Sequence, residues 1–289
     1  MRDFEYEAPT SVAEAVQALS RHDGSARPLA GGTDLIDQIR LGRHLPQVVV
    51  DIKKIPELNV LELTATGLRL GAAVPCYRIY GDERVSRAYA ALADSARIIG
   101  GIQIQSRASV GGNLCNSGPA ADSTPSLIAL GAVAVIAGPK GPREVAVENF
   151  CTGPGKNVLE PGEFLVELRL PARPAHSGSH YRRFIPRNEM DIAVVGVAAS
   201  VVLDKTGEKF ESARIALGAV GPTPLFAKAA GDLLAGQKIT GEVIARAVDA
   251  ARSIARPIDD MRGTKEFRLE ITGVLTRRVL EEAVRQAKL

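Results

Sequence analysis

The apolar positions near the N-terminus recur at the spacing of an α-helix. Four of them follow one another at i, i+3, i+4 and i+7, namely Val12, Ala15, Val16 and Leu19. Residues at this spacing lie on one face of a helix. Ser11 precedes the run and Glu14 follows three residues later, which is the spacing of an N-terminal capping box. The pattern therefore predicts an amphipathic helix that begins after Ser11 and ends at Gly24.

The segments that follow alternate between strand and helix patterns. A short apolar strand is expected at 27–30, and apolar residues at helical spacing predict a second helix at 35–41. The β-branched run at 48–50 is typical of a buried strand. A strand, a helix and a strand in this order indicate a small parallel unit at the start of the chain.

Beyond residue 58 the pattern changes to alternating strands. Strands at 58–63 and 68–70 are expected to form a hairpin around Thr66 and Gly67. Apolar residues at helical spacing predict a helix at 84–99. Further elements expected in this part are a helix that begins at Pro125 and strands at 133–136, 143–147 and 164–170.

A stretch with prolines and small polar residues at 171–179 indicates a linker, and we expect a domain boundary there. Beyond it the pattern predicts strands at 192–203 and 213–220, and then helices at 225–234, 243–255 and 267–287. Strands followed by helices indicate an α+β arrangement. We therefore predict two domains, at 1–175 and 176–289, the first of them divided into subdomains at about 1–55 and 56–175.

The composition is that of an ordinary globular protein and argues against several function classes. Of the 289 residues, 45% are hydrophobic and 24% are charged, and the net charge is only +3. Aromatic residues make up 4% and Trp is absent, so little stacking surface is available for a nucleic acid. The longest apolar run, at 192–203, is too short to span a bilayer, and residues 1–6 lack the apolar stretch of a secretory signal. We expect a soluble protein that binds no nucleic acid and has no membrane span.

The cysteines and histidines offer no constellation for catalysis or for metal binding. Cys76, Cys115 and Cys151 include no CxxC pair, so a zinc site and a self-contained iron–sulfur cluster both lack ligands. An odd and sparse set of cysteines also argues against a disulfide framework and fits a reducing cytoplasm. The histidines have no ligand spacing, and no Ser or Cys lies in a nucleophile elbow. We therefore expect a cytoplasmic protein without catalytic or metal-ligating residues of its own.

Two glycine pairs are the most informative features of the sequence. Gly31-Gly32 and Gly111-Gly112 each follow a short apolar strand and precede polar residues. Paired glycines allow a turn whose N–H groups point one way, and such a concavity suits a phosphate group. A single pair is more often a tight turn, but two pairs from distant segments could clamp the two phosphates of one dinucleotide. Neither the Rossmann glycine fingerprint nor a P-loop is present.

Asp122 and a group of arginines each leave two interpretations open. Asp122 could accept hydrogen bonds from ligand hydroxyls, or it could cap the helix at Pro125, and its residue type favours the cap. Three arginines at 182–187 precede a predicted buried strand, and a solvated edge is the ordinary interpretation of such a run. Thr33 or Asp34 could cap the helix after the first glycine pair. The residues alone thus indicate a two-domain protein with a dinucleotide phosphate site.

Several motifs, in order along the chain, resemble those of one family. The first glycine motif reads Pro28-Leu29-Ala30-Gly31-Gly32-Thr33-Asp34-Leu35, and the second reads Arg107-Ala108-Ser109-Val110-Gly111-Gly112-Asn113. Asp122 keeps its spacing from the second motif, and the segments at 150–156, 159–163 and 190–193 also fit. Over essentially the whole chain, the sequence resembles the flavoprotein subunits of the xanthine dehydrogenase and carbon monoxide dehydrogenase family, which are molybdenum hydroxylases.

This resemblance implies a fold and an FAD site. The fold would be α+β, with an FAD-binding domain of the vanillyl-alcohol-oxidase (PCMH) type in two subdomains, and a C-terminal domain of antiparallel sheet with helices. The residues expected to bind FAD are Leu29, Ala30, Gly31, Gly32, Thr33, Asp34, Ile99, Ser109, Val110, Gly111, Gly112, Asn113, Asp122, Leu165 and Arg183. The two glycine motifs would hold the pyrophosphate and its neighbours.

The remaining site residues would surround the flavin itself. Asp122 would contact flavin-linked hydroxyls or the surroundings of the isoalloxazine ring, and Ile99 and Leu165 would line the flavin. Arg183 stands where some relatives carry a lysine, and a cation there would stabilise the negative charge that builds at N1 on reduction. Arg and Lys differ in geometry and hydration, so this replacement bears on the tuning of the flavin.

Family membership would also assign partners and a role in electron transfer. A large subunit would carry the molybdopterin, a small subunit would carry two [2Fe-2S] clusters, and the complex would be a dimer of heterotrimers. This chain would take electrons from the clusters and pass them to an external acceptor such as NAD⁺, a quinone or oxygen. Two alternatives stay open: a self-sufficient FAD-dependent oxidase or dehydrogenase, which would need a general base beside the flavin, and a module that has lost its cofactor.

Overall fold

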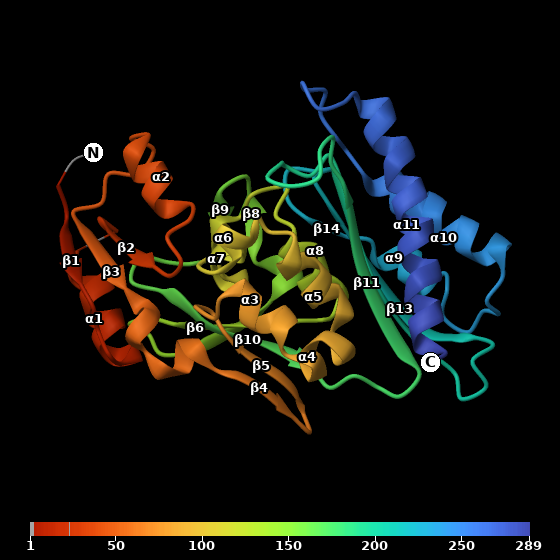
Figure 1. The fold of residues 1–289 in the computed structure, drawn as a ribbon, viewed down its shortest axis with the longest axis horizontal. Coiled ribbons are helices and arrows are strands. Elements are labelled where there is room, and N and C mark those ends of the chain that lie inside the picture. The colour runs from red at the N-terminus through yellow and green to blue at the C-terminus, as the bar shows by residue number, and fades with distance from the viewer. Residues whose placement is uncertain (1–2, 23) are drawn as a thin grey trace.

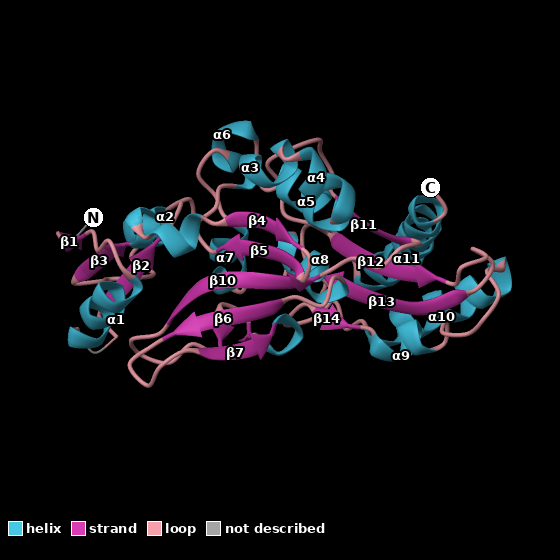
Figure 2. Ribbon diagram, turned by 90° about the horizontal axis from the view of Figure 1, so that it is seen from below, coloured by secondary structure: helices cyan, strands magenta, loops and turns pink. Residues whose placement is uncertain are grey.

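The computed structural model describes residues 3–22 and 24–289, and it places three main sheets one after another along the chain (Figures 1 and 2). The N-terminal sheet lies at one end of the long axis, and the C-terminal sheet with its long helix lies at the other. A five-stranded sheet and a group of short helices lie between them. The short helices of the central part lie against the C-terminal sheet.

The N-terminal part is the parallel unit that the sequence predicts. Its strands are ordered β1-β3-β2 and both pairings are parallel. The bounds are β1 Glu5–Glu7, α1 Val12–Arg21, β2 Ala26–Leu29, α2 Leu35–Arg40 and β3 Val48–Asp51. Ser11 caps α1 as predicted, because its Oγ accepts a hydrogen bond from the Glu14 N–H. All four residues of β3 are buried, as expected for its central place, whereas β1 is a strand that the pattern did not predict.

The central part is an antiparallel sheet covered by helices on one face. Its strand order is β4-β5-β10-β6-β7, with β4 Leu61–Thr64, β5 Gly67–Gly71, β6 Val133–Ala137, β7 Arg143–Ala146 and β10 Phe164–Pro171. The helices are α3 Cys76–Gly81, α4 Glu83–Ala88, α5 Ala90–Arg97, α6 Ile102–Gln105, α7 Val110–Asn116 and α8 Ser123–Ala129. Short 3-10 turns lie at Ile52–Lys54, Pro56–Asn59 and Val147–Asn149, and a hairpin is formed by β8 Cys151–Gly153 and β9 Lys156–Asn157.

Three predictions for this part were wrong in detail. The first hairpin strand begins at Leu61, because Leu58 is buried in a 3-10 turn. The helix predicted at 84–99 is two helices that meet at Tyr89, whose backbone is not helical and whose buried side chain donates to the Pro171 carbonyl. Helix α8 begins at Ser123, two residues before Pro125. Contacts between side chains far apart in the sequence decide where these elements begin and end. The spacing of apolar residues carries no information about such contacts.

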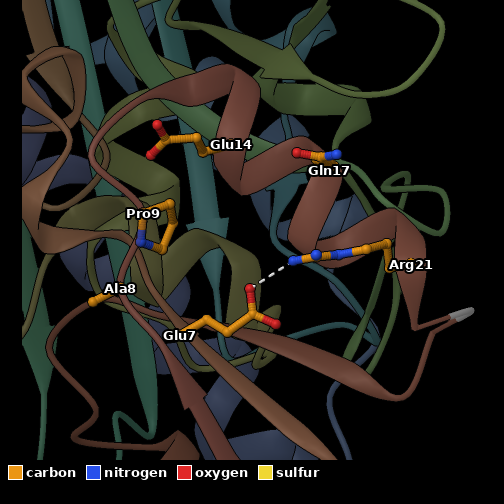
Figure 3. A pocket seen from close by; sticks show the side chains of 6 residues that line it. All are labelled: Glu7, Ala8, Pro9, Glu14, Gln17 and Arg21. Atoms are coloured by element: carbon orange, nitrogen blue, oxygen red, sulfur yellow. Dashed lines mark hydrogen bonds and ion pairs between the residues drawn. The ribbon is translucent and has the colours of Figure 1, made fainter.

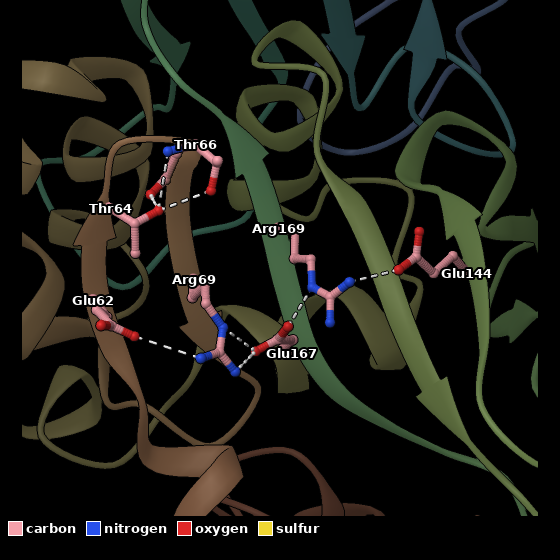
Figure 4. A network of polar contacts seen from close by, with 8 residues as sticks. Glu62, Thr64, Thr66, Arg69, Glu144, Glu167 and Arg169 are labelled. Carbon is pink, nitrogen blue, oxygen red and sulfur yellow. Dashed lines mark hydrogen bonds and ion pairs between the residues drawn. The ribbon is translucent and has the colours of Figure 1, made fainter.

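The face of the central sheet opposite the helices carries a row of alternating charges (Figure 4). Arg69 on β5 donates to Glu167 on β10 at 2.8 Å, and Arg169 also donates to Glu167. Glu62 and Glu144 extend the row at its two ends. Glu167 is only 2% exposed, and a carboxylate is tolerated at such a position because two guanidinium groups pair with it.

The C-terminal part is an antiparallel sheet between two layers of helices. Its strands are β11 Ser177–Phe184, β12 Val195–Leu203, β13 Phe210–Gly218 and β14 Leu225–Phe226, in this order. Its helices are α9 Lys228–Asp232, α10 Gly241–Ile254 and α11 Lys265–Ala287. Helix α11 packs on β11 and β12 from one side, and α5 and α8 of the central part pack on the sheet from the other.

Two sequence predictions fail at this sheet. Strand β11 occupies part of the segment expected to be a linker and a solvated edge, because Ser177–Phe184 pairs along its whole length with β12. The helix predicted at 225–234 is the two-residue strand β14 followed by the short helix α9. A mixed polar and apolar run does not distinguish a loop from an edge strand whose polar side chains find partners on another part of the protein.

Candidate functional site

The first glycine pair forms a turn between β2 and α2, and the two glycines are there for different reasons. Gly32 has φ +78°, in the left-handed region that favours glycine. Gly31 has no positive φ, but a Cβ atom on it would lie 2.1 Å from the Arg107 carbonyl oxygen. Asp34 immediately precedes α2, yet neither it nor Thr33 makes a side-chain capping bond, so that expectation was wrong. The turn brings its backbone against the second glycine motif.

The second glycine pair is not a loop, contrary to the sequence prediction. Gly111 and Gly112 belong to the first turn of α7, which Ser109 caps by accepting the Gly112 N–H at 3.0 Å. A Cβ atom on Gly111 would lie 2.5 Å from the Ala72 carbonyl oxygen. Glycine is therefore needed at 111 for close packing and not for an unusual backbone angle. The Ser109 cap was the sequence signal that this segment starts a helix.

The structure brings the two glycine motifs together, as a clamp on one dinucleotide requires. Besides the contact of Gly31 with Arg107, the Gln38 side chain on α2 donates to the Asn116 side chain at the end of α7, at 2.8 Å. Within the described residues, the N–H groups of 31–34 donate no hydrogen bond. Backbone donors left in such a turn are the groups that would receive a phosphate.

Asp122 binds two side chains of β11 and does not cap α8. Its Oδ1 accepts from the Tyr181 hydroxyl at 2.8 Å, and its Oδ2 accepts from Arg183 Nη1 at 2.6 Å. It makes no capping bond, so the interpretation as a cap was wrong. The Arg183 side chain is only 5% exposed, so the interpretation as a solvated edge was wrong for this arginine, although Arg182 and Arg187 are exposed.

Burial dominates the electrostatics of this group. It raises the pKa of Asp122 to about 6, although the charge of Arg183 and the hydrogen bonds from Tyr181 and Arg183 act in the opposite direction. The same burial and the neighbouring carboxylate raise the pKa of Tyr181 well above its usual value, so its hydroxyl stays a proton donor. Asp122 is thus an ionised acceptor at neutral pH, held between a phenol and a guanidinium group.

Polar atoms next to Asp122 lack partners within the protein. The Arg183 Nε and the Thr124 Oγ1 are buried and have no hydrogen-bond partner among the described residues. Buried polar groups almost always find a partner, so such orphans call for a ligand or an ordered water. This observation fits the polar atoms of a flavin nucleotide. Thr124 and Tyr181 were not among the predicted site residues. Tyr181 could have been found from the sequence if 177–184 had been predicted as a strand, because residues two apart on a strand lie on the same face and Arg183 was already a candidate.

The other predicted residues lie around these groups. Ile99, Val110 and Leu165 are buried in one apolar cluster of the central part, so the two residues predicted to line the flavin share a core with the start of α7. Asn113 on α7 accepts from the Ser123 hydroxyl at 2.6 Å and so ties α7 to α8. The structure therefore brings Asn113 close to the start of α8, beside Asp122.

Other features of the molecule are separate from this site. A shallow pocket on the N-terminal part lies between the end of β1 and α1, where Arg21 pairs with Glu7 at 2.8 Å (Figure 3). Its lining contains none of the predicted site residues. Within residues 3–22 and 24–289 no group of three or more metal-ligating side chains forms, and no helix is long and apolar enough to cross a membrane.

The parallel unit and the antiparallel sheet thus meet at the two glycine motifs, and the Asp122–Arg183 pair joins the central part to the third sheet. Residues 2–173 match the family described as the FAD binding domain in molybdopterin dehydrogenase. Residues 180–283 match the C-terminal domain of the CO dehydrogenase flavoprotein. The chain belongs to the FAD-binding subunits of the molybdenum hydroxylase family.

Relatives and solved structures agree with this assignment over the whole chain. The chain is 33% identical to the carbon monoxide dehydrogenase medium chain of Afipia carboxidovorans, covering 99% of this chain and 98% of the relative. It is 34% identical to a putative xanthine dehydrogenase FAD-binding subunit of Escherichia coli, with the same coverage of 99% and 98%. A carbon monoxide dehydrogenase structure from Hydrogenophaga pseudoflava superposes with a TM-score of 0.93 at 33% identity, covering 99% of this chain and 98% of that one.

These findings confirm the family, the fold class and the FAD-binding domain that the sequence predicted. A quinoline 2-oxidoreductase structure from Pseudomonas putida also superposes, with a TM-score of 0.90 at 30% identity over 100% of this chain and 99% of that one. The relatives are oxidoreductase subunits that serve different substrates, so the fold does not specify a substrate.

Proposed function

We propose that this chain binds FAD and passes electrons from the [2Fe-2S] clusters of a small partner subunit to an external acceptor, in a complex whose large subunit holds the molybdopterin. The observation that carries the proposal is the junction of the two glycine motifs, beside a buried Asp122–Arg183 pair with an unused Arg183 donor. Whole-chain similarity to medium chains of carbon monoxide dehydrogenase supports the same role. A dimer of heterotrimers and a cytoplasmic location stay predictions.

The residues of this chain would divide the binding of FAD among them. The backbone N–H groups of 31–34 would receive the pyrophosphate, because they donate no hydrogen bond within the described residues. Asp122 would orient the polar part of the flavin, and the buried guanidinium of Arg183 would supply positive charge where negative charge develops on reduction. Ile99 and Leu165 would exclude water from the ring. FAD, when bound, supplies the ability to store two electrons and release them to an acceptor.

We further propose that the chain is organised as an FAD-binding domain at 1–175, with subdomains at about 1–55 and 56–175, and a C-terminal domain at 176–289. The three separate sheets support this division. The hydrophobic clusters follow it only in part, because the cluster of the central part also contains Tyr181, Ala198 and Ala216 of the C-terminal part. Because Arg183 belongs to β11, the C-terminal domain would complete the flavin site.

An absorbance spectrum of the purified chain tests the proposal. The chain expressed alone should show a flavin spectrum, and co-expression with the genes of its partner subunits should add iron–sulfur absorbance and molybdenum in one co-purifying complex. A yellow protein that recruits no partner and reduces its own flavin with a small substrate would favour a self-sufficient flavoenzyme. A protein that stays colourless with added FAD would reject the flavin site altogether.

A further inference from the structure

We propose that Tyr181 is a positioning residue of the flavin site, which holds the Asp122 carboxylate so that Asp122 in turn fixes Arg183. Tyr181 donates its hydroxyl to Asp122 Oδ1, while Arg183 donates to Oδ2 of the same carboxylate. This inference rests on the proposed function, because it concerns the same site. It adds a residue that touches the carboxylate and not the cofactor.

The strand geometry makes this arrangement rigid. Tyr181 and Arg183 are two positions apart on β11 and therefore point to the same face of the sheet. Ser179 lies on that face as well, and its hydroxyl accepts from the Ala91 N–H at 3.2 Å. Ser179, Tyr181 and Arg183 thus each make a hydrogen bond to the central part, and Asp94 on α5 adds bonds to His180 and to the Tyr181 N–H. The phenol bond is one of several that join β11 to the central part.

The space around the phenol is made by a glycine. A Cβ atom on Gly196, on the neighbouring strand β12, would lie 2.6 Å from the Tyr181 hydroxyl oxygen. Gly196 has no positive φ, so its backbone does not itself demand glycine. The absence of a side chain at 196 instead leaves room for the hydroxyl to reach Asp122. A tyrosine that served only to fill the core would not require its hydroxyl to have this room.

The bond to Tyr181 has an electrostatic consequence for Asp122. Because the phenol stabilises the ionised carboxylate, its removal would raise the pKa of Asp122 further above its ordinary value. Other charged groups nearby are engaged elsewhere: Asp94 on α5 with His180 and the Tyr181 N–H, and Arg214 on β13 with Glu148 and the Ile128 carbonyl. Helix α7, which packs on α8, contributes no charged side chain. Burial therefore raises the pKa of Asp122, and Arg183 and Tyr181 are the groups that oppose this rise.

The test is the pH dependence of FAD binding to the full chain, with Tyr181→Phe as the variant. A protonated Asp122 no longer pairs with Arg183 as an anion, so FAD binding of the unaltered protein should weaken as pH falls through about 6. In Tyr181→Phe the weakening should set in at higher pH. At pH 7 we expect the Kd for FAD to rise by up to about tenfold, because a larger fraction of Asp122 is protonated once the Tyr181 bond is lost, and one pKa unit corresponds to a factor of ten. Fluorescence titration with FAD measures both quantities.

Tyr89→Phe is the matched control. Tyr89 is also buried, and its hydroxyl also makes one hydrogen bond, at 2.8 Å, but to the Pro171 carbonyl and not to Asp122. This variant also loses one buried phenol bond, but to a neutral carbonyl that does not titrate, so any fall in its FAD affinity should be independent of pH. Equal pH profiles for Tyr181→Phe and Tyr89→Phe would overturn the positioning role and leave Tyr181 as a structural residue only.

A second variant keeps the inference testable if Tyr181→Phe does not fold. Gly196→Ala retains the phenol but pushes it away from Asp122, and it should shift the pH profile in the same direction. An unshifted profile in a folded Gly196→Ala protein would contradict the inference. Failure of the proposed function is distinguishable, because the unaltered protein would then bind no FAD at any pH.

Discussion

The two glycine pairs of this protein have the same sequence but lie in different local structures. Gly31-Gly32 makes a turn, and one of its residues has a left-handed backbone. Gly111-Gly112 starts a helix, and neither residue has a positive φ. In each pair, however, the first glycine is pressed against another backbone carbonyl, that of Arg107 for Gly31 and that of Ala72 for Gly111.

Paired glycines therefore do not indicate one particular local structure. Three of the four positions exclude a side chain, two because of a close backbone contact and one because of φ. Gly112 is the least constrained, since a Cβ atom there would lie 3.1 Å from the capping Ser109 hydroxyl. Alanine substitutions at the four positions should therefore differ in a defined order, and the order itself tests the comparison.

Gly31→Ala should have the largest effect. Its Cβ would overlap the Arg107 carbonyl oxygen, so the two glycine motifs must move apart, at a cost of about 3 kcal/mol in the free energy of unfolding. The same separation should abolish retention of FAD during gel filtration. Urea unfolding followed by circular dichroism measures the first effect. A stable variant that keeps its flavin would show that the two motifs do not need this contact.

Gly111→Ala should be next. Its Cβ would press on the backbone and side chain of Ala72 in the central core, and overpacking of this kind costs about 2 kcal/mol. Because the contact lies beneath α7, we expect reduced stability with weakened but measurable FAD binding. If Gly111→Ala lowers the free energy of unfolding in urea more than Gly31→Ala does, the turn at Gly31 can rearrange around a side chain more easily than the packed helix α7 can.

Gly32→Ala should have an intermediate effect with a different cause. A left-handed backbone costs a residue with a Cβ about 1 kcal/mol, and the Leu29 side chain lies 3.0 Å from the Cβ position. The variant Gly32→Asn separates the two contributions, since asparagine tolerates this backbone region better than alanine. If asparagine is no better than alanine in urea unfolding, contact with Leu29 and not φ is responsible.

Gly112→Ala should have the smallest effect. Alanine favours a helix, and this gain offsets the tight contact with the Ser109 hydroxyl, so stability should change by less than about 0.5 kcal/mol. The variant should keep its stability, which makes it the stability control for the other three. Loss of flavin from a stably folded Gly112→Ala protein would mean that position 112 is in direct contact with the cofactor.

The sequence predicted the fold well wherever the signal is local. The capped helix α1, the parallel unit and the strands of the central sheet follow from periodicity and caps that involve residues a few positions apart. The failures share one cause. Tyr89 interrupts a helix to bond with Pro171, and β11 is a strand although its sequence is polar, because partners far along the chain stabilise both.

For the site, the sequence predicted candidate residues and indicated the family, and the structure determined how these residues meet. The glycine motifs and Asp122 were readable because each is a short pattern of residue types. The Asp122 bonds to Tyr181 and Arg183 join residues 59 and 61 positions apart, and the contact of Gly31 with Arg107 also joins distant segments. Only the packing of separate parts of the chain against one another creates such contacts. Local sequence determines the backbone preference of each segment and which of its faces is apolar, but it does not determine which faces pack together.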